Sequence, residues 1–281
     1  MKHIIDSHQH FWDINLNTYP WLKSDNQVLY KNYLPQDLSP LLKSNRISAT
    51  IIIQASPTVN ETEYLLDLAQ HTEIVKGVVG WVDLSSFNSI KTLEYFSKNI
   101  FFKGVRPMLQ DISDHNWINN YTNDDVIMHL SKLGLTIDLL INSNHISNVI
   151  NFIEKWPDIP MVINHFAKPD IDNNEFKVWS KHIHNLSIYS NVYAKMSGLL
   201  TQTKALNIPK MVDYFDCYFE LFGAKRIMWG SDWPVLTLNG TYKNWLDICT
   251  RYIVKKYSNS FDDVFCNVAR HFYKIDSGKS E

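Results

Sequence analysis

Two histidines and two aspartates lie within eight residues near the start of the chain, in the segment DSHQHFWD (6–13). Apolar residues precede this segment, so we expect a strand over 3–8. Residues two apart in a strand share one face, so Asp6, His8 and His10 are expected on one side of it. Two neutral imidazoles at this spacing can bind one divalent cation. For an isolated pair of this kind, two hydrogen-bonded histidines beside a loop is the alternative interpretation.

A second pair with the same spacing, His182 and His184, serves as an internal comparison. It lies in EFKVWSKHIHNL (175–186), which has the character of a helix or a polar loop. In a helix, residues two apart point roughly 200° away from each other and cannot hold one ion. We therefore interpret this pair as surface, and strand context carries the signal at the first pair.

Two further residues lie at predicted strand ends. His165 ends the apolar run MVINH (161–165), and Asp232 follows RIMWGS (226–231). In a closed barrel the last strand neighbours the first, so Asp232 would converge on the two early histidines at the carboxyl ends of the strands. Barrel active sites lie at that end.

The elements that would position these side chains are short apolar, β-rich runs that alternate with amphipathic stretches. The runs are HIIDSH (3–8), ATIIIQ (49–54), GVVGWV (77–82), FFKGVR (101–106), TIDLLI (136–141), MVINH (161–165), NVYAKMS (191–197) and RIMWGS (226–231). Helical spacing is clearest over 61–71, 124–134 and 210–223. Apolar strands alternating with helices predict a parallel sheet buried on both faces, and eight such units predict a single (β/α)₈ TIM-barrel domain over 1–281. A doubly wound open sheet is disfavoured because no glycine-rich loop follows the first strand.

Composition narrows the class of protein. The 281 residues carry a formal net charge of −2, which gives no electrostatic reason to expect nucleic acid or an anionic membrane as a partner. We see no secretory leader and no apolar stretch long enough to span a membrane. The three cysteines are scattered, which argues against a disulfide framework. We expect a soluble cytoplasmic protein.

The motifs together resemble those of amidohydrolase-superfamily barrels. Essentially the whole chain is covered, in order, by DSHQHFWD (6–13), YPWL (19–22), IIIQA (51–55), GVVGWVDL (77–84), KGVRP (103–107), NHFAKP (164–169), KMSGL (195–199) and MWGSDWP (228–234). The chain is similar to the amidohydrolase-2 group of sugar-lactone hydrolases, which includes fuconolactonase-like and rhamnonolactonase-like enzymes. This resemblance implies a metal-dependent-hydrolase barrel acting in carbohydrate metabolism.

The chain departs from the superfamily pattern at the metal site. The metal-bridging lysine of the fourth strand has no counterpart, since FFKGVRP offers Arg106 there, and the run TIDLLINS contains no histidine. A binuclear centre is therefore not expected. The resemblance implies at most one divalent metal, zinc before others, on His8, His10 and Asp232, and it leaves metal-independent catalysis open.

The activity expected from this resemblance is hydrolysis of the ring ester of an aldonolactone. Asp232 would take a proton from the attacking water, and His165 would polarise the carbonyl with Arg106 or the metal. The candidates for substrate binding are Gln54, Trp81, Arg106, Lys168 and Trp233. Each of these also has a structural interpretation, as a hydrogen-bond partner, a solvated side chain or core packing. We interpret Asp138, an odd charge in an apolar strand, as structural.

Two other functions remain open at this point. One is metal-dependent decarboxylation of an aromatic acid on the same barrel, and the other is a barrel that binds a sugar acid without turnover. The presence of all four strand-end residues favours an enzyme over a binding protein. The expected partner is a small molecule, and a homodimer is a further expectation.

Overall fold

The computed structural model describes residues 3–204 and 207–275. Within them, eight parallel strands follow one another in sheet order from first to last. The strands are β1 (Ile5–Gln9), β2 (Ala49–Ile53), β3 (Val75–Gly80), β4 (Phe102–Val105), β5 (Thr136–Leu139), β6 (Met161–Ile163), β7 (Val192–Met196) and β8 (Ile227–Trp229). Each begins and ends within two residues of an apolar run identified in the sequence, and the predicted (β/α)₈ barrel is confirmed.

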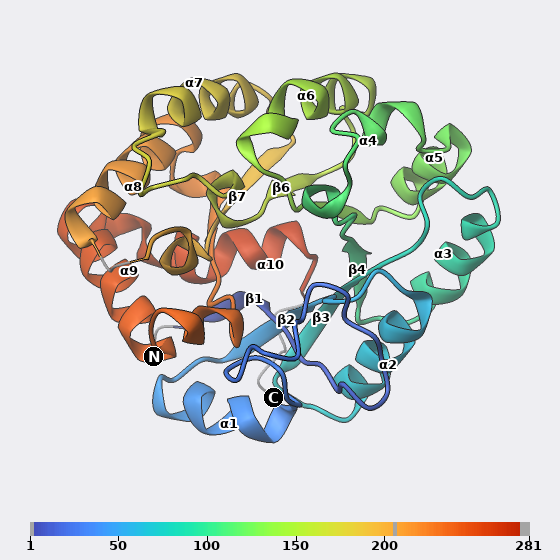
Figure 1. Ribbon diagram of the computed structural model, residues 1–281, viewed down its shortest axis with the longest axis horizontal. Coiled ribbons are helices and arrows are strands. Elements are labelled where there is room, and N and C mark those ends of the chain that lie inside the picture. Colours follow the sequence, from blue (N-terminus) through green and yellow to red (C-terminus); the bar gives the residue numbers. More distant parts are fainter. Residues whose placement is uncertain (1–2, 205–206, 276–281) are drawn as a thin grey trace.

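Helices surround the strands as an outer ring (Figure 1). They are α1 (Pro35–Ser44), α2 (Val59–Gln70), α3 (Ser89–Ser97), α4 (Trp117–Asn120), α5 (Asp124–Lys132), α6 (Ile146–Lys155), α7 (Phe176–Ser187), α8 (Ile208–Phe222) and α9 (Tyr242–Lys256), and the short α10 (Val268–Phe272) lies inside the ring. The three strongest helical patterns correspond to α2, α5 and α8, and Gly223, whose φ of 65° suits glycine, follows the last residue of α8. His182 and His184 lie on α7, where helical geometry separates them. In the part of the chain described, no helix combines the length and the apolar character needed to cross a membrane.

The barrel closes at the end where the predicted site residues lie. The backbone N–H of Asp232 donates to the carbonyl of His8 at 2.8 Å, and the N–H of His10 donates to the carbonyl of Trp233 at 2.7 Å. Gln9 and Trp233 form a parallel bridge. The segment after β8 is therefore hydrogen-bonded to the end of β1, which brings residues more than 200 positions apart into contact.

The expected place of Asp6 beside the two histidines is wrong. The pairing of β1 with β2 shifts register between Asp6 and Gln9, and such an irregularity moves the residues before it to the other face of the strand. Ile5 consequently packs inside the barrel, whereas the Asp6 carboxylate accepts a hydrogen bond from the hydroxyl of Tyr242 on α9 at 2.8 Å. Asp6 also accepts from the backbone N–H of Ser231, next to Asp232, at 2.8 Å, so it supports the site from outside the barrel, as a buried partner and not a ligand.

The opposite end of the barrel is closed by α10, which lies over the centre of the ring in Figure 1. One buried apolar cluster joins this helix and the turn before it to the inner side of the barrel. Its members are Ile5, Ala49, Ile51, Ile53, Val79, Val162, Met228, Cys266, Val268, Ala269, Phe272, Tyr273 and Ile275. The expected domain 1–281 also includes residues 1–2, 205–206 and 276–281, which lie outside the described residues.

Candidate active site

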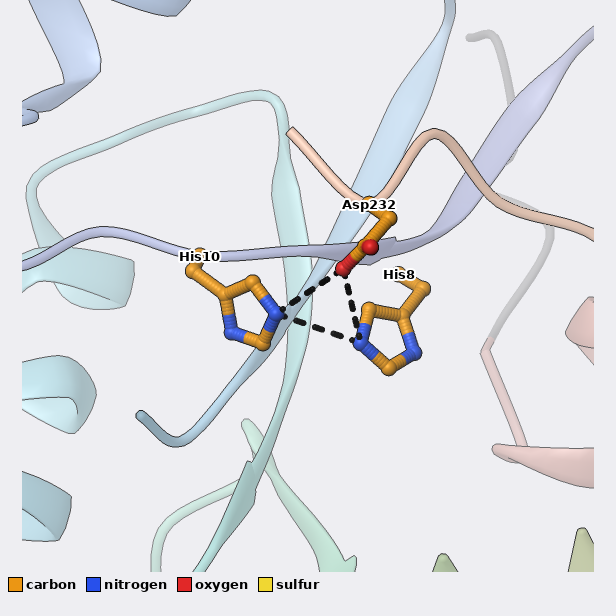
Figure 2. A group of neighbouring side chains, drawn as sticks. All are labelled: His8, His10 and Asp232. Atoms are coloured by element: carbon orange, nitrogen blue, oxygen red, sulfur yellow. Dashed lines mark hydrogen bonds and ion pairs between the residues drawn. The ribbon is translucent and has the colours of Figure 1, made fainter. Parts of the chain in front are cut away.

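His8, His10 and Asp232 meet at the carboxyl ends of β1 and β8 (Figure 2). The Nε2 atoms of the two histidines are 3.2 Å apart, and Asp232 Oδ1 lies 3.8 Å from Nε2 of His8 and 3.4 Å from Nε2 of His10. All three side chains are buried. Donor atoms this close together, from two imidazoles and a carboxylate, form a set that could hold one metal ion.

The hydrogen bonding of His10 shows that this donor set fits a cation. His10 Nδ1 lies 2.8 Å from the carbonyl oxygen of Ile53, which can only accept, so Nδ1 carries the ring hydrogen. In the neutral ring, Nε2 then presents a lone pair to Asp232 Oδ1, which is also an acceptor. The same lone pair lies 3.2 Å from His8 Nε2, so it is satisfied either by a hydrogen on His8 Nε2 or by a cation among the three groups.

A buried ion pair beneath the histidines sets the hydrogen position on His8. Lys195 Nζ on β7 lies 2.5 Å from Asp138 Oδ2 on β5, and Asp138 also accepts hydrogen bonds from Asn164 and Tyr273. Burial lowers the pKa of Lys195 to about 8, against the opposing effect of Asp138, which leaves the amine mainly charged at neutral pH. Its Nζ is 3.2 Å from His8 Nδ1, and an ammonium can only donate. His8 Nε2 therefore carries the ring hydrogen while Lys195 is charged.

His165 reaches the site from an unusual turn after β6. Residues His165 to Lys168 all have positive φ, between 49° and 57°, so the chain makes a left-handed turn. This conformation costs roughly 1–2 kcal/mol for each residue with a side chain, a cost found mainly where function requires it. The indole of Trp179 donates to the carbonyl of Phe166 at 2.6 Å and helps to hold the turn. The turn places both His165 and Lys168 in the wall of one cavity.

Ser197 and Gly198, directly after β7, contact the His165 ring. His165 Nδ1 lies 2.9 Å from the hydroxyl oxygen of Ser197, and its Nε2 lies 3.6 Å from Asp232 Oδ1. Gly198 follows with a φ of 67°, and a Cβ atom there would lie 2.4 Å from His165 Nδ1. The glycine is thus required both by its backbone conformation and by the closeness of the imidazole.

Burial and neighbouring charges set the charge states of His165 and Asp232. Burial lowers the pKa of His165 to about 3, so this imidazole is neutral at physiological pH. Burial alone would raise the pKa of Asp232, but interactions with His165, His10 and Lys168 outweigh it and hold that pKa below the ordinary 3.8. The site therefore combines an ionised carboxylate with a neutral imidazole, as a general base and a hydrogen-bonding partner would require.

A cavity of about 110 Å³ opens above these groups. Arg106 and Lys168 add two cations to its wall, and Trp21, Met108, Leu140 and Val235 are among its apolar residues. The Arg106 guanidinium donates to both the backbone carbonyl and the side-chain oxygen of Gln54. The cavity can accept a small polar molecule on which negative charge develops.

The structure separates the predicted substrate-binding residues into two groups. Arg106 and Lys168 line the cavity with His10, His165 and Asp232. Three others lie elsewhere. Gln54 is fully buried and its amide oxygen accepts from Arg106, Trp81 lines a neighbouring apolar cavity, and Trp233 packs against Phe11 and Tyr33.

Sequence reasoning missed Lys195 as a residue that shapes the site, and it gave Trp21 no role there. Lys195 carried a signal, because it is a lone cation in the apolar run NVYAKMS just as Asp138 is a lone anion in TIDLLI. A buried charge is costly unless an opposite charge lies beside it, so a lone cation and a lone anion in buried strands are expected to form a pair. Trp21 carried no such signal, since its position depends on how the segment between β1 and α1 folds over the rim.

Comparison with known proteins places the chain among hydrolases. The sequence profile described as amidohydrolase matches residues 5–275. An L-fucono-1,5-lactonase of Burkholderia ambifaria is 35% identical over 280 residues, covering 97% of this chain and 96% of the relative. An L-fucono-1,5-lactonase of Burkholderia multivorans is 29% identical over 266 residues, covering 90% of each. The crystal structure of an amidohydrolase from Burkholderia multivorans with bound zinc superposes with a TM-score of 0.90 at 26% identity, covering 97% of this chain and 99% of the other.

Proposed function

Because the chain belongs to the amidohydrolase family and is a hydrolase acting on carboxylic ester bonds, we propose that it opens the ring ester of an aldonolactone to the hydroxy acid. The observation that carries the proposal is the meeting of His10, His165 and Asp232 around one point in the cavity wall, with two cations beside them. The similarity to two L-fucono-1,5-lactonases supports a sugar lactone as substrate.

In this proposal Asp232 is the general base. Its ionised carboxylate takes a proton from a water molecule as the water attacks the ring carbonyl, and the tetrahedral oxyanion forms. When the bond to the ring oxygen breaks, Asp232 returns the proton to that oxygen, which leaves as a hydroxyl group. The product is a hydroxy acid with one more ionisable group than the lactone.

His165 and the two cations hold the negative charge in this proposal. We assign His165 the tautomer in which Nδ1 accepts from the Ser197 hydroxyl, 2.9 Å away, so that Nε2–H is available in the cavity for the substrate carbonyl. Arg106, fixed by Gln54, and Lys168 stabilise the oxyanion and then the carboxylate of the product. Removing one such contact typically costs about 10²–10³ in turnover.

We also propose that His8, His10 and Asp232 hold one divalent cation, zinc before others. The observation that supports this is the pair of facing acceptors on His10 and Asp232, and the solved relative with zinc is in keeping with it. When bound, the cation lowers the pKa of water to about 7 and polarises a carbonyl oxygen. His8 can join the ligand set only when its ring hydrogen moves to Nδ1, which requires Lys195 to be neutral.

The proposal is tested with a panel of aldonolactones, with acid release followed by a pH indicator in the presence and absence of a chelator. We expect at least one lactone to be opened with one acid equivalent released per molecule. If every lactone of the panel opens only at its uncatalysed rate, under both conditions and with zinc added, the proposal is wrong.

A further inference from the structure

A second cavity lies beside the catalytic one at the same rim of the barrel. Its volume is about 380 Å³, more than three times the 110 Å³ of the catalytic cavity. Segments that follow β1, β2, β3 and β4 form its walls. Trp21 and Met108 line both cavities, so the two cavities adjoin at these side chains.

The walls of this second cavity are flat and apolar. Three tryptophans and three prolines contribute to them, namely Trp21, Trp81, Trp117, Pro20, Pro57 and Pro107. Aromatic and proline rings present rigid planar surfaces, which suit the apolar face of another ring better than a flexible chain. The cavity therefore favours a ring-shaped occupant.

Hydrogen bonds hold two of these tryptophans in place. The Trp21 indole donates to the carbonyl of Ala55 at 2.7 Å. The Ala55 amide in turn donates to the buried carboxylate of Glu61, at 3.0 and 3.1 Å from its two oxygens. The backbone N–H of Trp81 donates to the Thr62 hydroxyl at 2.8 Å. The cavity is consequently preformed, which lowers the cost of ordering it around a ligand.

Two carboxylates, Asp83 and Asp111, are the polar side chains of the cavity wall. Ser85 donates its N–H and its hydroxyl to one oxygen of Asp83, at 3.0 and 2.6 Å. The second oxygen of Asp83 has no donor among the described residues and can accept from a ligand hydroxyl. The two negative charges disfavour an anionic occupant and suit a neutral ring with hydroxyl groups at its edge.

We propose that this cavity is a substrate subsite for a sugar ring linked to the lactone, so that the enzyme's substrate is a glycosyl aldonolactone. The inference rests on the proposed lactone hydrolysis and adds the size and class of the substrate. The lactone ring occupies the catalytic cavity, and the linked ring stacks on the tryptophans with its hydroxyl groups toward the two carboxylates. A methyl or hydroxyl substituent would leave most of the 380 Å³ unfilled.

The test compares lactones that differ only in the second ring. The kcat/KM values of glucono-1,5-lactone and of the 1,5-lactones of cellobionic, maltobionic and lactobionic acid are measured for the unchanged protein, Trp81→Ala, Trp117→Ala and the control Phe87→Ala. Phe87 is 60% exposed and outside the cavity wall. We expect at least one glycosyl lactone to exceed glucono-1,5-lactone at least ten-fold. The ratio of kcat/KM for the glycosyl lactone to kcat/KM for glucono-1,5-lactone should fall below two in both tryptophan variants. In Phe87→Ala the ratio should stay at least ten.

The inference is overturned if no glycosyl lactone exceeds the parent by more than two-fold, or if the ratio survives both tryptophan substitutions. If no lactone of either kind is opened, the proposed hydrolysis fails separately. In that case the subsite is tested by measuring the affinities of gluconate, cellobionate, maltobionate and lactobionate by calorimetry. Binding at least ten-fold tighter for one of the glycosyl acids, lost in Trp117→Ala, would support it, and equal affinities would overturn it.

Discussion

Asp232 and His165 owe their charge states to their surroundings, and the surroundings fix a pH dependence. Catalysis as proposed needs Asp232 ionised and His165 neutral. The pKa of Asp232 lies below 3.8, and burial is the main cause that lowers the pKa of His165 to about 3. At any pH above both values Asp232 is ionised and His165 is neutral. Both groups become protonated only in stronger acid. We predict that kcat/KM for the lactone, measured with a chelator present so that no metal-bound water contributes, is constant between about pH 5 and 7. A fall with a midpoint near 6.5, the ordinary value for histidine, would show that His165 is not held neutral.

The charge of Lys195 opposes cation binding at His8, because it keeps the ring hydrogen on Nε2. Lys195→Met alone would leave Asp138 buried without a counter-ion, so the informative variant is Lys195→Met with Asp138→Asn. We predict that this double variant binds zinc at least ten-fold more tightly than the unchanged protein, as measured by calorimetry. Tyr273→Phe removes a hydrogen bond to Asp138 but keeps the ion pair between Asp138 and Lys195, and it is the matched control. Unchanged affinity in the double variant would show that Lys195 does not restrain His8.

The residues at strand ends could be predicted because a strand end and a parallel neighbour define where a side chain lies. This logic placed His8, His10 and Asp232 near one another before any coordinates. It failed for Asp6, because a register shift within one strand leaves no mark in the residue types. Trp81 follows its strand in a loop and lines the neighbouring cavity, not the one that holds His10, His165 and Asp232, so its part in substrate binding stays a prediction.

At the scale of elements, the left-handed turn after β6 and the glycine after β7 act together. Alanine at Gly198 would keep a strained φ of 67° and push against His165, whereas alanine at Gly223 would keep a φ of 65° with no heavy atom within 4 Å. We predict that the strained backbone costs each variant about 1–3 kcal/mol in the free energy of unfolding, and that Gly198→Ala loses more because of its contact with His165. Only Gly198→Ala should lose lactonase activity, by at least ten-fold. Equal activity in the two variants, measured beside their denaturant midpoints, would count against the placing of His165 by this glycine.

No pattern of residue types predicts the left-handed turn over 165–168. Residues with side chains rarely adopt positive φ in succession, so a sequence-based expectation assigns His165 simply to a strand end. The turn depends on tertiary contacts, such as the Phe166 ring stacked on Tyr218 with centroids 4.2 Å apart. Contacts between residues distant in the chain are what the residue types alone do not specify.

The barrel has the candidate active site at one end and a buried apolar seal at the other. The (β/α)₈ architecture could be predicted because buried parallel strands are near-continuous apolar runs, and their alternation with helices admits few topologies. The closure of the barrel by α10 was not predicted, because a five-residue helix is too short to give a recognisable pattern of apolar residues. The barrel thus carries its cation and carboxylate chemistry at one rim and an apolar seal at the other.

This division predicts that stability and activity can be changed separately. Phe272 on α10 is buried against Tyr193 and Tyr273, far along the barrel from the catalytic cavity. We predict that Phe272→Ala lowers the free energy of unfolding by about 3–5 kcal/mol while kcat/KM of the folded protein stays within about three-fold. Denaturant unfolding and kinetics at low temperature measure the two quantities. A loss of kcat/KM as large as that of a cavity residue would contradict the separation.

The most direct measurement is the turnover of Asp232→Asn on an aldonolactone that the unchanged protein opens. Asparagine keeps the size of the side chain but cannot take a proton from water. With Asp67→Asn as an exposed control, we predict that kcat falls at least about 10²-fold in Asp232→Asn and is unchanged in the control. If Asp232→Asn, shown to be folded, retains kcat within about three-fold, Asp232 is not the base and the meeting of these side chains does not perform the hydrolysis.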